Sequence, residues 1–212
     1  MPDRSSIEVV TEALAKAPER KFSETVEVSI NLKDLDLTVP KNRLEDEIPL
    51  PNGRGKAVKV AVFGSPELLQ KVRNVADVVV ASNQLDEFAK DKKAAKKAVG
   101  QIDFFLAEAP LMPTIGKRLG VVLGPRGKMP RPVPPGSDPT NLVNALKRSV
   151  RVRSKGNRTF HAAVGTRSMK PEAIAQNVDA VLARIVGKLE RGRTNIESVY
   201  VKTSMGPAVR LW

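Results

Sequence analysis

The chain has 212 residues, 41% of them hydrophobic, so it can bury the core of one large domain or two small ones. The absence of cysteine excludes disulfides, a thiol nucleophile and thiolate metal sites, and no apolar run approaches the roughly 20 residues that cross a bilayer. With no signal-peptide pattern and a formal charge of +13, we expect a cytoplasmic protein with a polyanionic partner and no membrane partner.

The first elements expected along the chain are a short helix and a strand. Residues 5–8 (Ser-Ser-Ile-Glu) match a capping box, and apolar residues follow at helical spacing. Residues 25–32 alternate strictly between polar and apolar side chains. We expect a strand with one wet face and one buried face, the latter formed by Val26, Val28, Ile30 and Leu32.

The middle of the chain has a different character. Residues 57–63, 78–81 and 102–106 are nearly continuous apolar runs, and helical patterns at 66–74 and 83–99 separate them. Strands that alternate with helices and are buried on both faces indicate a parallel sheet of βαβ units. A proline-rich stretch at 129–139 is expected to be an extended loop.

Basic residues gather between positions 115 and 170. This quarter of the chain holds 13 of the 36 Lys and Arg residues and a single acid, Asp138, whereas the rest is nearly neutral. Like charges held close together repel one another, so an anionic partner is expected there. A solvated basic face without a partner is the alternative.

A Gly-Pro-Arg-Gly-Lys-Met-Pro string within this segment invites comparison with a nucleotide P-loop. A P-loop has four residues between its glycines, a Ser or Thr after the lysine, and a helix directly following. Here two residues separate Gly124 from Gly127. Met129 follows Lys128, and a proline then blocks a helix. Nucleotide hydrolysis is disfavoured, which leaves a basic loop that approaches phosphates or an ordinary surface turn.

The C-terminal part returns to half-exposed elements, with strands expected at 158–165 and 198–203 and an amphipathic helix at 171–189. The predicted fold class is α/β with two domains. A discontinuous α+β domain is formed by residues 1–57 and 154–212. A Rossmann-like three-layer α/β domain, 58–153, is inserted in it. The joints, 51–56 and 153–157, are rich in turn formers and form a plausible hinge.

No catalytic or metal-binding constellation is visible in the sequence. His161 is the only histidine, and the serines lack the Gly-x-Ser-x-Gly context of a nucleophile. We therefore expect a protein that is not an enzyme, without catalytic residues, cofactors or metals. A nucleotide-dependent enzyme remains an alternative, which stabilisation by nucleotide in a thermal-shift titration would reveal.

Residues 202–207 run off the last strand with two hydroxyls, a methionine and a glycine before a proline. Such a segment offers close backbone approach and hydroxyl donors to a shallow RNA groove, although a tight turn with a core-filling methionine fits equally well. Aromatic residues make up only 4%, so folded RNA is favoured over single strands that stack on aromatics. A DNA-binding protein is weakly disfavoured, and equal affinity for duplex DNA and folded rRNA would reveal one.

Several ordered motifs resemble the family of large-subunit ribosomal protein one (L-one), and together they span essentially the whole chain. They are Lys-Phe-Ser-Glu-Thr-Val-Glu-Val at 21–28, the 115–132 stretch, His-Ala-Ala-Val-Gly at 161–165 and Val-Tyr-Val-Lys-Thr-Ser-Met-Gly-Pro at 199–207. The short length and Met129 are closer to archaeal members. The resemblance implies the same discontinuous domain with a Rossmann-like insertion.

The resemblance also implies a function. Members are structural constituents of the large ribosomal subunit that bind rRNA directly, form the mobile stalk near the tRNA exit site and assist release of deacylated tRNA. Many are translational repressors that bind their own mRNA leader. The expected partners are therefore large-subunit rRNA, exit-site tRNA, the chain's own mRNA leader and other ribosomal components, and the free protein is expected to be a monomer.

Carried over by motif, the resemblance implies an rRNA- and mRNA-binding platform on two strands. Its residues are Phe22, Glu24, Thr25, Glu27, Ser29, His161, Thr203, Ser204, Met205 and Gly206. Secondary basic contacts to RNA are expected at Arg126, Lys128, Arg131, Lys155, Arg158 and Arg167. The platform is expected to set specificity, so that Gly206→Val blocks binding, and charge reversal at Lys128 and Arg131 is expected to flatten the salt dependence.

Overall fold

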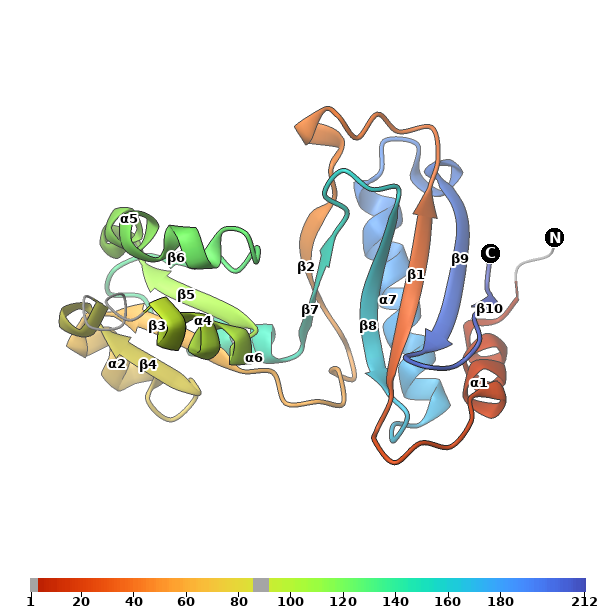
Figure 1. Cartoon of the computed structure of the whole chain (residues 1–212), viewed down its shortest axis with the longest axis horizontal. Coiled ribbons are helices and arrows are strands. Elements are labelled where there is room, and N and C mark those ends of the chain that lie inside the picture. The colour runs from red at the N-terminus through yellow and green to blue at the C-terminus, as the bar shows by residue number, and fades with distance from the viewer. Residues whose placement is uncertain (1–3, 86–91) are drawn as a thin grey trace. The chain divides into compact units, whose positions relative to one another are not determined.

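A computed structural model of the chain describes residues 4–85 and 92–212, and the chain divides into two compact units. Unit 1 comprises Met1–Lys56 and Arg148–Trp212, and unit 2 comprises Ala57–Lys147, so the chain passes between the units twice (Figure 1). The predicted fold class, an α/β insertion in a domain formed by both chain ends, is confirmed. In the described part of the chain, no helix combines the length and apolar character that crossing a membrane requires.

The second boundary lies earlier in the chain than the sequence indicated. Strand β7 (Ser149–Arg153) pairs antiparallel with β2 (Glu45–Pro49), and both belong to unit 1. Charge complementarity accompanies the pairing, because Arg151 Nη2 lies 2.7 Å from Glu47 Oε1 and Arg153 Nε lies 3.2 Å from Glu45 Oε1. Residues 153–157, predicted as a joint between domains, instead comprise the last residue of β7 and the turn toward β8, all within unit 1.

A four-stranded antiparallel sheet, here called sheet A, organises unit 1. Its strand order is β10-β9-β1-β8, with β1 at Thr25–Leu32, β8 at Thr159–Thr166, β9 at Ile196–Thr203 and β10 at Val209–Arg210. Helices α1 (Ser6–Lys16) and α7 (Pro171–Lys188) pack against each other and against one face. That face forms the core predicted from the alternation in β1, with Val26, Val28, Ile30 and Leu32 fully buried.

Among the described residues, no helix of unit 1 covers the opposite face of sheet A. Figure 1 looks onto this face, with α7 behind strands β8 and β1. The predicted capping box at the start of α1 is wrong: Ser5 occupies the N-cap position, but within the described residues its side chain makes no capping hydrogen bond. The start of α1 is stabilised instead by a tertiary contact, in which Ser6 Oγ donates to Asp179 Oδ1 of α7.

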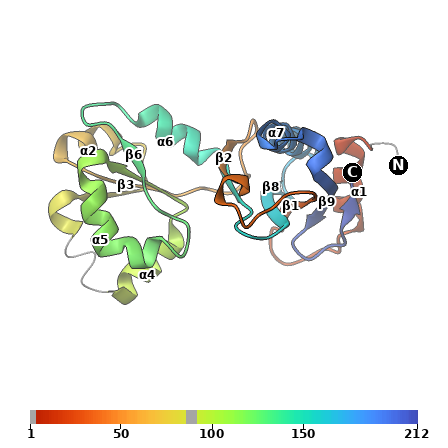
Figure 2. The same cartoon turned by 90° about the horizontal axis from the view of Figure 1, so that it is seen from above.

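Unit 2 is a three-layer α/β fold around a parallel sheet of order β4-β3-β5-β6. Figure 2 shows α4 and α6 on opposite sides of these strands. One core packs Phe63 and Phe105, stacked at 5.8 Å between ring centroids, against α4 and α5. The other packs Val62 and Leu106 against α2 and α6. The strands are β3 (Val60–Gly64), β4 (Val78–Ala81), β5 (Phe104–Glu108) and β6 (Arg131–Val133), and the helices are α2 (Pro66–Val72), α4 (Lys92–Gln101), α5 (Met112–Leu123) and α6 (Thr140–Lys147).

Most segments of unit 2 match the expected elements. The centre of the predicted helix at 83–99, residues 86–91, lies outside the described residues; a short 3-10 turn, Ser82–Gln84, precedes it and α4 follows it. The proline-rich stretch at 129–139 is largely extended but contributes β6, a short edge strand parallel to β5. Prolines are tolerated there because an edge strand leaves one side of its backbone unpaired. Further 3-10 turns lie at Pro40–Asn42, Ala109–Leu111 and Gly192–Asn195.

Candidate nucleic-acid interface

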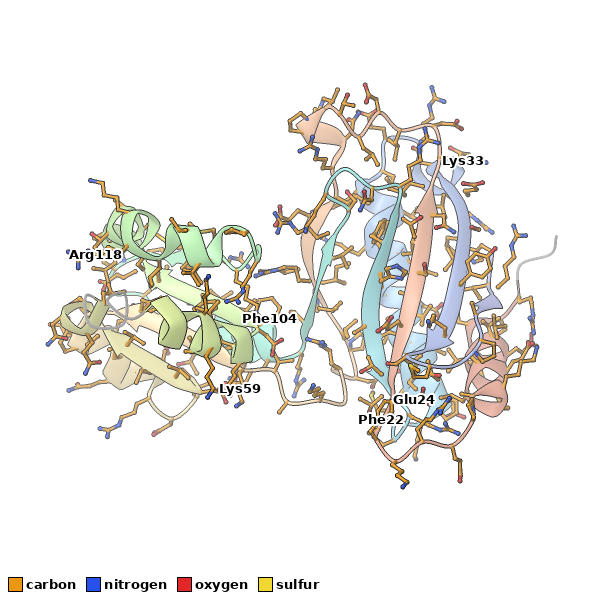
Figure 3. All side chains as sticks on the ribbon, in the orientation of Figure 1. Phe22, Glu24, Lys33, Lys59, Phe104 and Arg118 are labelled. Atoms are coloured by element: carbon orange, nitrogen blue, oxygen red, sulfur yellow. The ribbon has the colours of Figure 1, made fainter. Side chains whose placement is uncertain are left out.

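Two large apolar side chains are exposed at the end of sheet A where β1 begins and β9 ends. Phe22 precedes β1 and is 55% exposed, and Met205 follows β9 and is 61% exposed. The pairing of Val26 with Thr203 brings these two chain segments to the same end of the sheet. Figure 3 shows Phe22 and Glu24 at that end and Lys33 at the other. Exposed apolar side chains within a polar surface are typical of a contact site.

A buried carboxylate holds the turn that carries Met205. The turn comprises residues 203–206 and is called the Met205 turn here. Glu24 is fully buried, and its Oε1 accepts hydrogen bonds from Thr203 Oγ1 at 3.2 Å and from the Met205 backbone N–H at 3.0 Å. Burial would raise the pKa of Glu24, but these bonds and Arg167 outweigh it and hold the pKa below its ordinary value. The carboxylate is therefore charged at neutral pH and fixes the backbone beneath Met205.

Arg167 completes this arrangement from the segment that follows β8. Its Nη1 lies 3.1 Å from Glu24 Oε2 and also donates to the carbonyl of Pro18 at 2.7 Å. Its Nη2 donates to the carbonyl of Ala17, just after α1, at 3.2 Å. The guanidinium thus ties the end of α1, the start of β1 and the Met205 turn together. Its role as a secondary RNA contact stays a prediction, and the bonds described here give the side chain an internal role.

Two other predicted contact residues also serve the turn from within. Thr203 is fully buried like Glu24, so neither side chain reaches the surface that a partner would meet. A Cβ at Gly206 would lie 2.4 Å from Thr203 Oγ1 and 3.1 Å from Ala17 Cβ. Gly206→Val would therefore distort the turn before it blocked a partner, so loss of binding in this variant cannot prove steric block. Ser204 is half-buried, and its hydroxyl donates to the Thr25 carbonyl at 3.3 Å.

The remaining predicted residues lie on the helix-free face of sheet A. Thr25, Glu27 and Ser29 of β1 are half-buried there, and His161 of β8 is exposed and pairs with Ser29. Sequence reasoning missed the contribution of β9 to this face, where Tyr200 pairs with Ser29 and Lys202 pairs with Glu27. The signal was available, since both alternate out of phase with the buried Val199 and Val201. We call these six residues the open face: Thr25, Glu27, Ser29, His161, Tyr200 and Lys202.

Lys128, the centre of the basic loop, is engaged inside unit 2. Its Nζ donates to the carbonyls of Val99 at 2.9 Å, Gly100 at 3.5 Å and Ile102. Val99 and Gly100 belong to the last turn of α4, where the backbone carbonyls accept no hydrogen bond from the helix itself. The lysine thus caps α4 and complements its negative end. The prediction of Lys128 as an RNA contact stays a prediction, and its bonds to these carbonyls give the ammonium an internal role.

Lys128→Met should weaken unit 2 without weakening RNA binding. Losing an ammonium shared by three carbonyls is expected to lower the free energy of unfolding by roughly 1–2 kcal/mol and to speed amide exchange in the last turn of α4. Urea denaturation and hydrogen exchange measure these effects. Lys117→Met, on the exposed surface of α5, is the control and should change stability by less than about 0.5 kcal/mol. A flattened salt dependence of RNA binding in Lys128→Met would show instead that Lys128 contacts phosphates.

The other predicted basic contacts fall into two groups. In unit 2, Arg126 is exposed but its Nη1 donates to the Lys96 carbonyl at 2.9 Å, and Arg131 lies exposed on β6. In unit 1, Lys155 and Arg158 lie in and just after the turn between β7 and β8. Both are exposed, and among the described residues neither side chain has a hydrogen-bond or ion-pair partner. These two cations are therefore the best placed of the six to meet a phosphate.

The structure of unit 2 disfavours the alternative of a nucleotide-dependent enzyme. Open α/β sheets bind ligands beyond the carboxyl ends of the strands, where the strand order reverses, which here is between β3 and β5. At that point Glu108 Oε2 accepts a hydrogen bond from the Ser65 backbone N–H at 2.8 Å. A carboxylate thus already takes a backbone donor at this point, and its charge disfavours a phosphate there. The Gly124–Lys128 loop follows the carbonyl end of α5, which also disfavours an anion.

Comparisons with known proteins agree with this geometry. A family model described as the ribosomal protein L1p/L10e family matches residues 13–207. The large ribosomal subunit protein uL1 of Thermoplasma acidophilum is 58% identical over 202 residues, which is 95% of this chain and 93% of the relative. Those of Thermoplasma volcanium and Pyrococcus horikoshii are 56% and 51% identical, each covering 99% of this chain and 97% and 96% of the relative.

Proposed function

The chain belongs to the ribosomal protein L1p/L10e family, and from this premise we propose that it is a structural component of the large ribosomal subunit in the cytoplasm that binds rRNA through unit 1. It acts as a binding protein and not as an enzyme. The observation that carries the proposal is the exposure of Phe22 and Met205 at one end of the well-packed sheet that also carries the open face. A rigid scaffold that presents such side chains is suited to recognising a partner by shape.

Folded RNA fits this surface better than other polyanions. The minor groove of an RNA helix is wide and shallow and displays 2′-hydroxyls, which are read by polar and apolar side chains on a flat support. Ser29, His161 and Tyr200 supply donors and acceptors along the open face, and Met205 supplies an apolar contact. The formal charge of +13 adds attraction to phosphates.

The finer parts of the proposal follow from the family resemblance. We propose that the chain forms a mobile stalk near the tRNA exit site and assists release of deacylated tRNA. The same surface of unit 1 would bind the chain's own mRNA leader and repress its translation, because one shape-reading site cannot bind two RNAs at once. The free protein acts as a monomer, which makes it available to either RNA.

Binding to a transcript of Thermoplasma acidophilum large-subunit rRNA tests the proposal. Specific binding should exceed binding to duplex DNA of equal length by about 1,000-fold or more at matched salt, and ribose footprinting should protect one folded region. Competition with the chain's own mRNA leader then tests repression, since the leader should displace the rRNA. Equal affinity for duplex DNA and rRNA would contradict the assignment.

Charge reversal at Lys155 and Arg158 should flatten the salt dependence of rRNA binding. Each lost phosphate contact lowers the slope of log affinity against log salt by roughly 0.7 to 0.9 on scales measured for DNA, so the double variant Lys155→Glu and Arg158→Glu should lower it by roughly 1.4 to 1.8. The matched control reverses Lys59 and Lys117, two exposed lysines of unit 2. The control should leave the slope unchanged. Equal slopes in both double variants would show that these two cations do not contact phosphates.

A further inference from the structure

Glu24 stands out among the residues of unit 1 because it is hidden and yet connected to the exposed Met205 turn. Its side chain is fully buried, so RNA on the surface cannot touch it. Its two oxygens nevertheless accept hydrogen bonds from Thr203, from the backbone of Met205 and from Arg167. No other described carboxylate lies beneath the Met205 turn in this way. Glu24 thus acts on the surface only through the turn that it holds.

We propose that Glu24 is a positioning residue for RNA recognition, which fixes the Met205 backbone N–H and thereby presents the Met205 side chain to the RNA. The inference rests on the proposed function, since it requires that the Met205 turn meets RNA. It assigns Glu24 a role beneath the surface in place of the direct contact that the family resemblance implied. Arg167 pairs with Oε2 of the carboxylate, while the Met205 turn uses Oε1.

The chemistry of the contacts requires a carboxylate at position 24. An ionised carboxylate only accepts hydrogen bonds, and every group that faces Glu24 here is a donor. Glutamine offers one accepting oxygen and one donating amide. The glutamine oxygen can accept hydrogen bonds either from the Met205 turn or from Arg167. In each case the NH₂ group faces the remaining donor, with which it cannot form a hydrogen bond. Glu24→Gln therefore keeps the size of the side chain and breaks its support of the turn.

Gly206 and Thr203 show how closely the turn is packed around this carboxylate. The Gly206 backbone N–H donates to the Thr203 carbonyl at 3.3 Å, and a Cβ at Gly206 would collide with Thr203 Oγ1. The Thr203 hydroxyl is thus held between Gly206 and Glu24. A change at Glu24 is transmitted to Met205 both by the lost N–H bond and by release of this hydroxyl.

A double-mutant cycle between Glu24 and Met205 tests the inference. Affinity for the Thermoplasma acidophilum large-subunit rRNA transcript is measured for the wild type, Glu24→Gln, Met205→Ala and the double variant. Each single variant should weaken binding roughly tenfold, and the double variant should be about as weak as Met205→Ala alone, because Glu24 acts through Met205. The slope against salt should stay unchanged, since no phosphate contact is lost. A double variant roughly 100-fold weaker, the product of independent effects, would overturn the inference.

A second variant keeps the test decisive if Glu24→Gln folds poorly. Thr203→Val removes one donor to Glu24 Oε1 with little change in shape, and it should weaken binding by roughly threefold in the wild type and not at all in the Met205→Ala background. Hydrogen exchange supplies an independent readout. Exchange of the Met205 amide should accelerate in Glu24→Gln, whereas the amides of β1 should stay protected. An unchanged Met205 amide with weakened binding would overturn the inference.

Glu12→Gln is the matched control. Glu12 is a carboxylate of the same unit, paired with Arg4 and Lys16 of the N-terminal segment, and no described hydrogen bond or ion pair joins it to the Met205 turn. Its substitution should change rRNA affinity less than twofold.

Different results would contradict the proposed function and this inference. If the wild type does not prefer the rRNA transcript over duplex DNA, the proposed function is wrong; if it does, and Glu24→Gln and Met205→Ala act independently, only the role of Glu24 is wrong.

Discussion

Met205→Glu should reduce affinity for large-subunit rRNA by roughly 100-fold, the largest effect expected of any single surface change. A central side chain of an interface typically contributes about 2 kcal/mol or more, and a carboxylate placed among phosphates adds repulsion. Stability should be unaffected because Met205 is 61% exposed, and exposed substitutions usually change the free energy of unfolding by less than about 0.5 kcal/mol. Filter binding at fixed salt measures the affinity, and urea denaturation checks the fold.

Val121→Glu is the control for this change. Val121 is 79% exposed on α5 of unit 2, so the same type of substitution is made on an exposed apolar side chain outside the proposed interface. Its only effect on binding should be a small one from the altered net charge. Comparable losses in both variants would mean that Met205 matters through charge alone and not through contact.

Arg167→Met should destabilise unit 1 by roughly 2–3 kcal/mol. Removing one partner of a buried ion pair leaves the other charge unsatisfied, and Glu24 is fully buried. The effect should stay below that of a deeply buried pair because the Arg167 side chain is 29% exposed and Glu24 keeps its bonds to Thr203 and Met205. Trp212 is the only tryptophan of the chain and belongs to unit 1, so its fluorescence follows this transition in urea.

Arg184→Met provides the comparison. Arg184 pairs with Asp46 at 2.8 Å, but its side chain is 56% exposed, and this substitution should lower stability by less than about 1 kcal/mol.

The stability of unit 1 should depend on pH through Glu24, with a defined sign. Because the pKa of Glu24 is lowered from 4.5, its contribution is fully present above pH 4.5 and is lost as pH falls through the lower folded pKa. Arg167→Met should lose part of this acid sensitivity, and an unchanged profile would argue against the ion pair.

The alternation of side chains carries information about the Met205 turn that motif resemblance does not. Glu24 is in phase with Val26 and Val28, and Thr203 is in phase with Val199 and Val201, so continued alternation places both side chains on the buried side. The family resemblance names the two segments as an RNA-binding platform but does not distinguish an exposed residue from a buried one that supports the turn. Periodicity makes that distinction, because it reports which face a side chain occupies.

Other features depend on contacts between distant segments and leave no local pattern. The pairing of β2 with β7 joins strands from before and after the inserted unit, and its complementary charges become visible only when Glu47 and Arg151 are side by side. Lys128 caps α4 by donating to backbone carbonyls. Because every residue has a backbone carbonyl, no sequence pattern marks this contact, and from the sequence alone the lysine is predicted as a phosphate ligand. A basic cluster in sequence therefore does not tell which of its charges are also engaged within the protein.

Site-directed photocrosslinking from position 205 tests the central claim, that unit 1 meets rRNA at the Met205 turn. A photoreactive amino acid is placed at position 205 and, in a separate sample, at position 121, and each protein is irradiated with the Thermoplasma acidophilum large-subunit rRNA transcript. Position 205 should crosslink to nucleotides of one folded region, and position 121 should give only background. Crosslinks from position 121 to that same region, with none from position 205, would contradict the account.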